Sequence, residues 1–235
     1  MTHPIADNLT RIRKKMADAA RRAGRAPQAI KLIAVTKKKS PAEILMAVQH
    51  AQYDFAESYI QDFAIKHNEL AGNNINWHFI GHIQRNKAKK IVGQVCLIHS
   101  LDRMTLASEI NKLSAEKRLV QDCLVQVKIA DEESKSGCAI ADLFSFVHAL
   151  GSLSHINIKG LMTIGSLTED LTQTRSEFRA MKTLCEKINK DHIYKSPLTE
   201  LSMGMSSDYT VAIEEGATLI RVGTDLFGER DPHNT

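Results

Sequence analysis

The sequence predicts a single (β/α)8 barrel, a TIM barrel, with an additional helix at its N-terminus. Eight short apolar runs alternate with longer segments of helical periodicity, and the length of 235 residues suits one such domain. No linker rich in Pro, Gly or Ser divides the chain. A doubly wound open sheet is the alternative. We therefore expect one domain over residues 1–235, in which residues 1–24 form a helix packed on the barrel.

The individual elements follow from hydrophobic periodicity. In the first helix, Ile5, Leu9, Ile12 and Met16 recur at helical spacing, and Gly24 can end it. The apolar runs that predict strands are residues 32–35, 53–56, 77–80, 95–98, 120–129, 158–164, 198–203 and 218–222. The segments that predict the intervening helices are residues 41–51, 59–70, 84–92, 103–117, 139–150, 172–190 and 207–215.

Composition and charge argue against several classes of protein. The net charge is only +4, and the basic clusters at residues 21–25 and 85–90 have no interleaved aromatic residues, so we expect solvated helix faces and no nucleic-acid partner. The four cysteines are scattered, which indicates neither a metal site nor a disulfide framework. The charged N-terminus is unlike a signal peptide, and no apolar run approaches 18 residues. We expect a cytoplasmic protein that does not enter membranes.

The ends of the last two predicted strands indicate a phosphate site. In TIM barrels the active site lies at the C-terminal ends of the strands, and the loops after strands 7 and 8 often bind phosphate. Here those loops read "LSMGMSSD" and "RVGTDLFGE", and their Ser, Thr and Gly residues can offer hydroxyl and backbone N–H donors. Ser206, Ser207 or Asp208 can cap the helix that follows. Arg221, on the last strand, can face the ligand.

Three consecutive lysines, Lys37, Lys38 and Lys39, follow the first predicted strand. At the mouth of a barrel, burial and cationic neighbours can lower the pKa of an amine and make it nucleophilic. A lysine opposite a phosphate site suggests a phosphorylated carbonyl ligand held as a Schiff base. Pyridoxal 5′-phosphate and the sugar phosphate of an aldolase both fit, and the residues alone do not choose among the three lysines.

Several motifs occur in an order and spacing that resemble a known family. They are "KLIAVTK", "FAESYIQD", "WHFIGHIQRNK", "SKSG", "GLMTI" and "LSMGMSSDYTVAIEEGATLIRVGTDLFGER". Together they resemble the YggS/PROSC family of pyridoxal phosphate homeostasis proteins over nearly the whole chain. The resemblance implies the barrel of the alanine racemase N-terminal domain and pyridoxal 5′-phosphate as the cofactor.

The resemblance also implies which residues bind the cofactor. Its V-[S/T/A]-K motif selects Lys37 as the Schiff-base lysine, with Lys38 and Lys39 as cationic neighbours. Its two C-terminal motifs imply further cofactor-binding residues, which are Ser202, Met203, Gly204, Ser206, Arg221, Gly223 and Thr224. We expect Ser206, Gly223 and Thr224 closest to the phosphate. Arg221 is expected near either the phosphate or the ring nitrogen.

The chain departs from the family pattern in two motifs. Ala56 and Ser58 stand where the family usually has Gly and Asn, so a contact from Ser58 to the cofactor must be shorter or water-mediated. His82 stands where Pro is frequent, and a surface or supporting imidazole is a better interpretation than an acid or base. No role is assigned to the "SKSG" glycine or to Lys135 beside it.

The same resemblance favours a binding protein over an enzyme. Related racemases use a second base, a tyrosine from an additional C-terminal domain, and this sequence stops at Thr235 after the eighth unit. We expect a monomer that holds pyridoxal 5′-phosphate for intracellular homeostasis, without significant catalysis, and that can deliver it to apoenzymes. The alternative is a racemase or decarboxylase of amino acids. An aldolase would need an acidic partner, for which Glu57 is the candidate.

Overall fold

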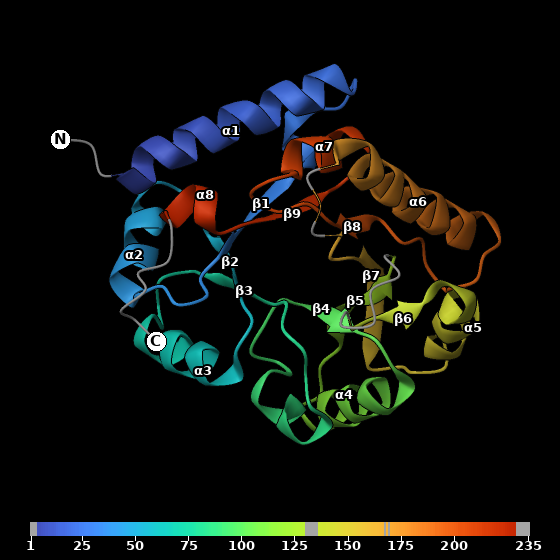
Figure 1. The fold of residues 1–235 in the computed structure, drawn as a ribbon. Helices are drawn as coiled ribbons and strands as arrows, with labels where there is room; N and C mark the ends of the chain where they lie inside the picture. The colour runs from blue at the N-terminus through green and yellow to red at the C-terminus, as the bar shows by residue number, and fades with distance from the viewer. Residues whose placement is uncertain (1–3, 130–135, 167, 169, 229–235) are drawn as a thin grey trace.

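The computed structural model describes residues 4–129, 136–166, 168 and 170–228, which form a closed barrel of parallel strands inside a ring of helices (Figure 1). Pairing of β4 with β5, and of β9 with β1, closes the barrel. The barrel strands are β1 (Lys31–Val35), β2 (Asp54–Glu57), β3 (Asn76–Phe79), β4 (Leu97–Leu101), β5 (Gln121–Lys128), β7 (Ile156–Met162), β8 (Glu200–Ser202) and β9 (Leu219–Val222). The prediction of a (β/α)8 barrel is confirmed.

Helices follow most of the strands and cover the outside of the barrel. They are α2 (Pro41–Gln49), α3 (Ile60–Glu69), the 3-10 helix η2 (Arg85–Lys90), α4 (Met104–Glu116), α5 (Ile140–Leu150), α6 (Leu171–Lys190), α7 (Tyr209–Glu214) and α8 (Thr224–Phe227). A further 3-10 turn, η1 (Pro27–Ala29), precedes β1.

The additional helix α1 (Pro4–Arg22) lies across the outside of the barrel, next to α7 and α8 (Figure 1). Its buried face contains Ile5, Leu9, Ile12 and Met16, the residues whose spacing predicts the helix. Arg11 pairs with Asp225 at 2.7 Å, which attaches α1 to α8.

The barrel interior is a packed layer of side chains. Side chains alternate along a strand, so one set faces the helices and the other faces the barrel axis. The apolar residues of the inner set form one small cluster, made up of Ile33, Ala56, Leu97, Leu124, Met162 and Leu219. A larger cluster fills the space between strands and helices.

Three local expectations were wrong. The fourth strand begins and ends later than residues 95–98, because His99 and Ser100 are buried within β4 and do not follow it. The segment expected as a helix at 84–92 is only the 3-10 turn η2. Residue 139, the expected start of a helix, instead ends a short strand, β6 (Cys138–Ala139), which pairs with β5.

Candidate functional site

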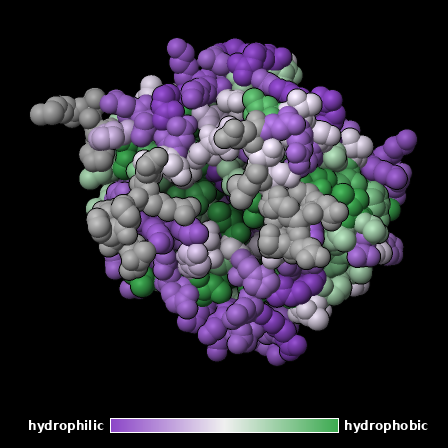
Figure 2. Space-filling model, viewed as in Figure 1, coloured by the Kyte–Doolittle hydropathy of each residue, from purple (hydrophilic) through white to green (hydrophobic). Residues whose placement is uncertain are grey.

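A cavity of about 530 Å³ opens at the C-terminal ends of the barrel strands. Figure 2 shows hydrophobic residues in a hollow near the centre of the face that it presents, with hydrophilic residues around it. The residues that line the cavity come from six strand ends or the loops after them, and they are Val35, Ser58, Ile80, Met162, Ile164, Met205, Ser206, Ser207, Arg221, Gly223 and Thr224. Its volume falls in the range of small-molecule sites.

The alternation of the strands explains the walls of this cavity. Val35 lies two residues beyond Ile33, and Ile164 two residues beyond Met162, so both continue the inward-facing positions. Gly223 stands in the same relation to Arg221 on β9. The alternation of side chains along each strand therefore places both the apolar and the polar lining residues at inward-facing positions.

One side of the cavity carries a group of unpaired hydrogen-bond donors. Within the described part of the chain, the backbone N–H groups of Ser206, Ser207, Gly223 and Thr224 donate to no protein acceptor. The hydroxyl oxygen of Ser206 accepts from the backbone N–H of Asp225 at 3.2 Å, which leaves its proton available for a ligand. This donor set suits an anion with several oxygens.

Gly204 holds the loop after β8 in place. Its φ of +91° is a conformation that side chains with a Cβ rarely adopt, and a Cβ there would lie 2.5 Å from the Cβ of Ala212. Its carbonyl accepts from the backbone N–H of Arg221 at 3.0 Å, which ties the loop to β9. The Asp208 carboxylate accepts from Met205 N–H at 2.6 Å and makes no side-chain cap on α7.

Arg221 is a buried cation at the floor of the cavity, with only 4% of its surface exposed. It donates to Ser202 Oγ at 2.7 Å and to the carbonyl of Thr163 at 2.8 Å. Burial lowers its pKa to about 10, although the charge of Asp208 raises it. The guanidinium therefore stays charged at neutral pH and has further N–H groups available beyond these two bonds.

Lys37 lies half-buried at the rim, directly after β1 and Thr36. Its amine is 4.9 Å from the centre of the Tyr59 ring, and Lys37 is not one of the lining residues. This contact is a cation–π interaction, which is worth about 0.5–1 kcal/mol at exposed sites.

The other two lysines of the triplet differ from each other. Lys38 is exposed in a left-handed conformation with φ of 58°. Lys39 lies 3.4 Å from Glu43 and donates to the carbonyl of Phe227 at 3.2 Å. Lys39 is therefore a cationic neighbour of Lys37 whose charge is partly balanced by a carboxylate. Glu43 also forms a capping box with Ser40, which begins α2 immediately after the triplet.

A buried ion pair that was not expected from the sequence supports the segment that leads to Lys37. Lys66 Nζ lies 2.6 Å from Glu57 Oε1 and donates to the carbonyl of Thr36 at 2.7 Å. Glu57, with no exposed surface, also accepts from Thr36 Oγ1 and from the backbone N–H of Ser58. The available signal was Lys66 three residues after the core residue Phe63 on α3, which places both on one helix face.

The remaining expected residues do not line the cavity. Ser202 is fully buried and bound to Arg221, Met203 packs in the main core, and Gly204 is buried. The side chain of His82 is 52% exposed and lies 3.9 Å from Asp102. Ser134 and Lys135 of the "SKSG" motif lie outside the described residues.

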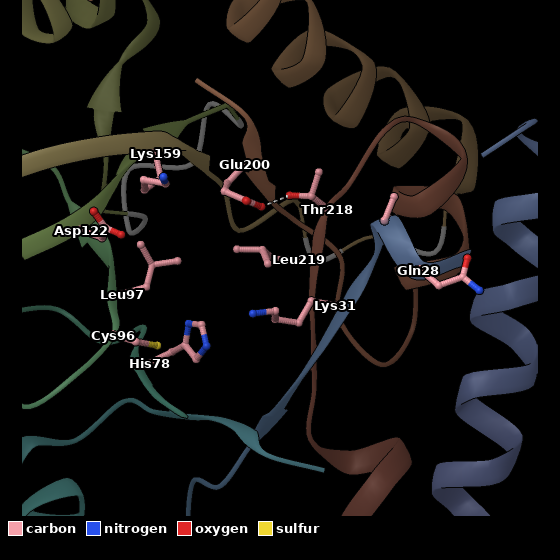
Figure 3. Close-up of a pocket in the computed structure, with 11 residues that line it drawn as sticks. Gln28, Lys31, His78, Cys96, Leu97, Asp122, Lys159, Glu200, Thr218 and Leu219 are labelled. Atoms are coloured by element: carbon pink, nitrogen blue, oxygen red, sulfur yellow. Dashed lines mark hydrogen bonds between the residues drawn. The ribbon is translucent and has the colours of Figure 1, made fainter. Parts of the chain in front are cut away.

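A second cavity, of about 360 Å³, opens at the other end of the barrel (Figure 3). The residues that line it include Lys31, His78, Cys96, Asp122, Lys159 and Glu200. Many of these groups bind one another or their neighbours: Lys31 and His78 both contact Asp54, and Thr218 donates to Glu200 at 2.6 Å. The N-terminal face of such a barrel generally serves stability.

Within the described residues, no cluster of His, Cys, Asp and Glu has the arrangement of a metal site. Nor does this part of the chain contain a helix that is both long and apolar enough to cross a bilayer.

The chain matches known proteins over almost its whole length. The family model "Alanine racemase, N-terminal domain" matches residues 7–231. The pyridoxal phosphate homeostasis protein of Aquifex aeolicus is 38% identical over 224 residues, which are 95% of this chain and 97% of that protein. The protein of the same name from Escherichia coli is 34% identical over 230 residues, 97% of each chain.

Solved structures give the same result. PipY of Synechococcus elongatus with PLP bound superposes with a TM-score of 0.85 at 34% identity, covering 95% of this chain and all of that one. An alanine racemase from Corynebacterium glutamicum, at 15% identity, shares the fold with a TM-score of 0.67 over 99% of this chain and 62% of its own. The chain belongs to the family of pyridoxal phosphate homeostasis proteins, which is built on the barrel of the alanine racemase N-terminal domain.

Proposed function

We propose that this protein binds pyridoxal 5′-phosphate as a Schiff base on Lys37 and acts in its intracellular homeostasis, without significant catalysis. One observation carries the proposal: a single cavity combines apolar walls, a cluster of unpaired donors on one side and a buried guanidinium at its floor. Pyridoxal 5′-phosphate has complementary parts, namely an aromatic ring, a phosphate dianion and a basic ring nitrogen. Its binding by PipY, a member of the same family, supports the assignment.

The phosphate fits the donor side of the cavity. Its oxygens would accept from the hydroxyls of Ser206, Ser207 and Thr224 and from the unpaired N–H groups of the same two loops. Hydrogen bonds to a charged acceptor are about twice as strong as those between neutral groups. These loops therefore set the position of the phosphate end.

The pyridine ring fits between the apolar walls, above Arg221. Ile80, Met162 and Ile164 can cover its faces and exclude water. We place the ring nitrogen toward Arg221, because the phosphate donors gather on the two loops and leave the guanidinium at the floor. A donor with a permanent charge disfavours protonation of that nitrogen, and this weakens the ring as an electron sink.

Lys37 supplies the covalent attachment. Its amine, which now contacts the face of Tyr59, would supply the nucleophile for the aldehyde carbon of the ligand. The bond formed would be a carbon–nitrogen double bond, with the aldehyde oxygen released as water. Because Lys66 and Glu57 fix the carbonyl and hydroxyl of Thr36, the backbone that presents Lys37 is already in place.

The environment of Glu57 supports a binding role over the enzymatic alternatives. Its two oxygens are occupied by Lys66, Thr36 and backbone N–H groups, so Glu57 is poorly suited to shuttle a proton in an aldolase.

A racemase or decarboxylase remains the second candidate class. Incubation with amino acids in deuterated water distinguishes it, since an enzyme would incorporate deuterium at the α-carbon at turnover rates, whereas we expect only trace exchange.

A spectroscopic titration tests the binding proposal. Adding pyridoxal 5′-phosphate to the purified protein should produce a visible absorption band that Lys37→Ala abolishes. Lys38→Ala is the matched control, because Lys38 is exposed and adjacent, and this variant should retain the band. An equal loss of the band in both variants, or an unchanged band in Lys37→Ala, would remove Lys37 from this role.

We further propose a monomer in a reducing compartment such as the cytoplasm, which can transfer the cofactor to apoenzymes. The four cysteines are free thiols, which supports the compartment. Light scattering during size exclusion tests the monomer: a mass near 26.2 kDa is expected, and a mass near twice this value would contradict it.

A further inference from the structure

A continuous row of hydrogen-bonded side chains runs through the barrel interior beneath Arg221. Arg221 Nη1 lies 2.7 Å from Ser202 Oγ, which lies 2.9 Å from His99 Nδ1. His99 Nε2 lies 3.0 Å from His78 Nδ1, and His78 Nε2 lies 3.2 Å from Asp54 Oδ1. The row joins β9, β8, β4, β3 and β2, and it ends beside the second cavity, where Figure 3 shows the His78 ring.

The chemistry at the two ends decides the direction of each hydrogen bond. Asp54 can only accept, so a neutral His78 carries its proton on Nε2 and offers Nδ1 as an acceptor. His99 must then carry its proton on Nε2, and its Nδ1 accepts the hydroxyl proton of Ser202. Ser202 therefore presents only lone pairs to Arg221, which can only donate.

The surroundings of His99 agree with the neutral form. Its side chain has no exposed surface, and burial, followed by the His78 ring and the charge of Arg221, lowers its pKa well below 6.5. Asp54 remains ionised: burial by itself raises its pKa, but the hydrogen bond from His78 and the charge of Lys31 leave that pKa below its ordinary value. With a cation at one end of the row and an anion at the other, every group donates toward Asp54, and each hydrogen bond strengthens the next.

Two hydrogen bonds, one to this row and one to a backbone carbonyl, hold the Arg221 guanidinium in place. Ser202 fixes Nη1, and the Thr163 carbonyl fixes Nη2. Two hydrogen bonds on one side of a planar guanidinium restrict its rotation, and the remaining N–H groups keep a constant direction.

We propose that His99 and His78 are positioning residues that orient Arg221 toward the ring nitrogen of the bound cofactor. This inference rests on the proposed function. Neither histidine touches the cofactor cavity, and both act only through Ser202 and Arg221. Their contribution should therefore be present only when the ligand has a ring nitrogen to receive the Arg221 hydrogen bond.

Two ligands test this selectivity with the full-length protein. One is pyridoxal 5′-phosphate, and the other is its analogue in which a C–H group replaces the ring nitrogen. Dissociation constants are measured for the wild type, for His99→Leu, and for His99→Gln, whose amide keeps one donor and one acceptor. Cys96→Ser is the control, because Cys96 lines the second cavity beside His78 but lies outside the row.

We expect His99→Leu to weaken binding of pyridoxal 5′-phosphate by about 10-fold and binding of the analogue by less than about 2-fold. His99→Gln should recover most of the loss, and Cys96→Ser should bind both ligands as the wild type does. Should His99→Leu fail to fold, Ser202→Ala interrupts the same row by removing one oxygen and must show the same selectivity.

Equal weakening for both ligands would overturn the inference, since it would indicate a general structural effect. Unchanged binding of pyridoxal 5′-phosphate in a folded variant would overturn it as well. If the wild type binds neither ligand, the proposed function fails before the role of His99 arises, so the two failures are distinguishable.

Discussion

Removal of the Lys66 amine should destabilise the protein strongly, because it leaves the Glu57 carboxylate buried without its counter-ion. Lys66 is 7% exposed and Glu57 is 0% exposed, at a separation of 2.6 Å. Breaking such a pair by removing one partner costs about 3–5 kcal/mol. For a chain of this length that corresponds to a fall in Tm of roughly 6–20 °C. Lys66→Met keeps most of the aliphatic volume and isolates the loss of charge.

Urea denaturation followed by circular dichroism measures the free energy of unfolding. Lys112→Met is the matched control, since Lys112 pairs with Glu116 at 3.9 Å on the surface and should contribute about 0–1 kcal/mol. The double variant Lys66→Met/Glu57→Gln should recover part of the stability by removing the unpaired charge. A loss in Lys66→Met no larger than in Lys112→Met would refute the argument that the buried pair supports this segment.

Three further predictions follow from the same region. Arg221→Gln should leave the fold intact and weaken binding of pyridoxal 5′-phosphate by roughly 10-fold or more. A spectroscopic titration measures this loss, and intact affinity would mean that Arg221 does not face the ligand. Gly204→Ala should destabilise by roughly 2 kcal/mol or more through strain and the contact with Ala212. Gly72→Ala has a similar φ of +88° with nothing within 4 Å and should cost less, so equal losses in urea would contradict the packing argument. Because the pKa of His99 lies well below 6.5 in the folded state, the unfolded chain binds more protons there, and stability is lost as pH falls below that value. His99→Gln should flatten this slope by up to about 1.4 kcal/mol per pH unit between pH 7 and 5, and an unchanged slope would argue against a neutral buried His99.

The fold was predictable from the sequence because its signals are local and repeated. Each apolar run had to become a strand, and each helical segment had to cover the barrel, for either to bury its hydrophobic face. The face of α1, with Ile5, Leu9 and Ile12, is the one that periodicity indicates. The fourth strand was misplaced because His99 is polar, and only the tertiary structure shows that its ring is satisfied inside the barrel.

The site was predictable only in part. The loops after β8 and β9 come together because these two parallel strands are neighbours in the barrel, and their Ser, Gly and Thr residues indicate an anion. The buried pair of Lys66 with Glu57, and the row beneath Arg221, depend on side chains from strands and helices far apart in the sequence. No local pattern encodes such contacts, so they required the structure.

Borohydride reduction followed by peptide mass spectrometry tests whether Lys37 carries the cofactor. The protein is loaded with pyridoxal 5′-phosphate, reduced and digested, and the modified lysine is located by fragmentation. We expect one reduced cofactor per chain, attached to Lys37. Modification of Lys38, Lys39 or another lysine in place of Lys37, or no stable adduct at all, would contradict it.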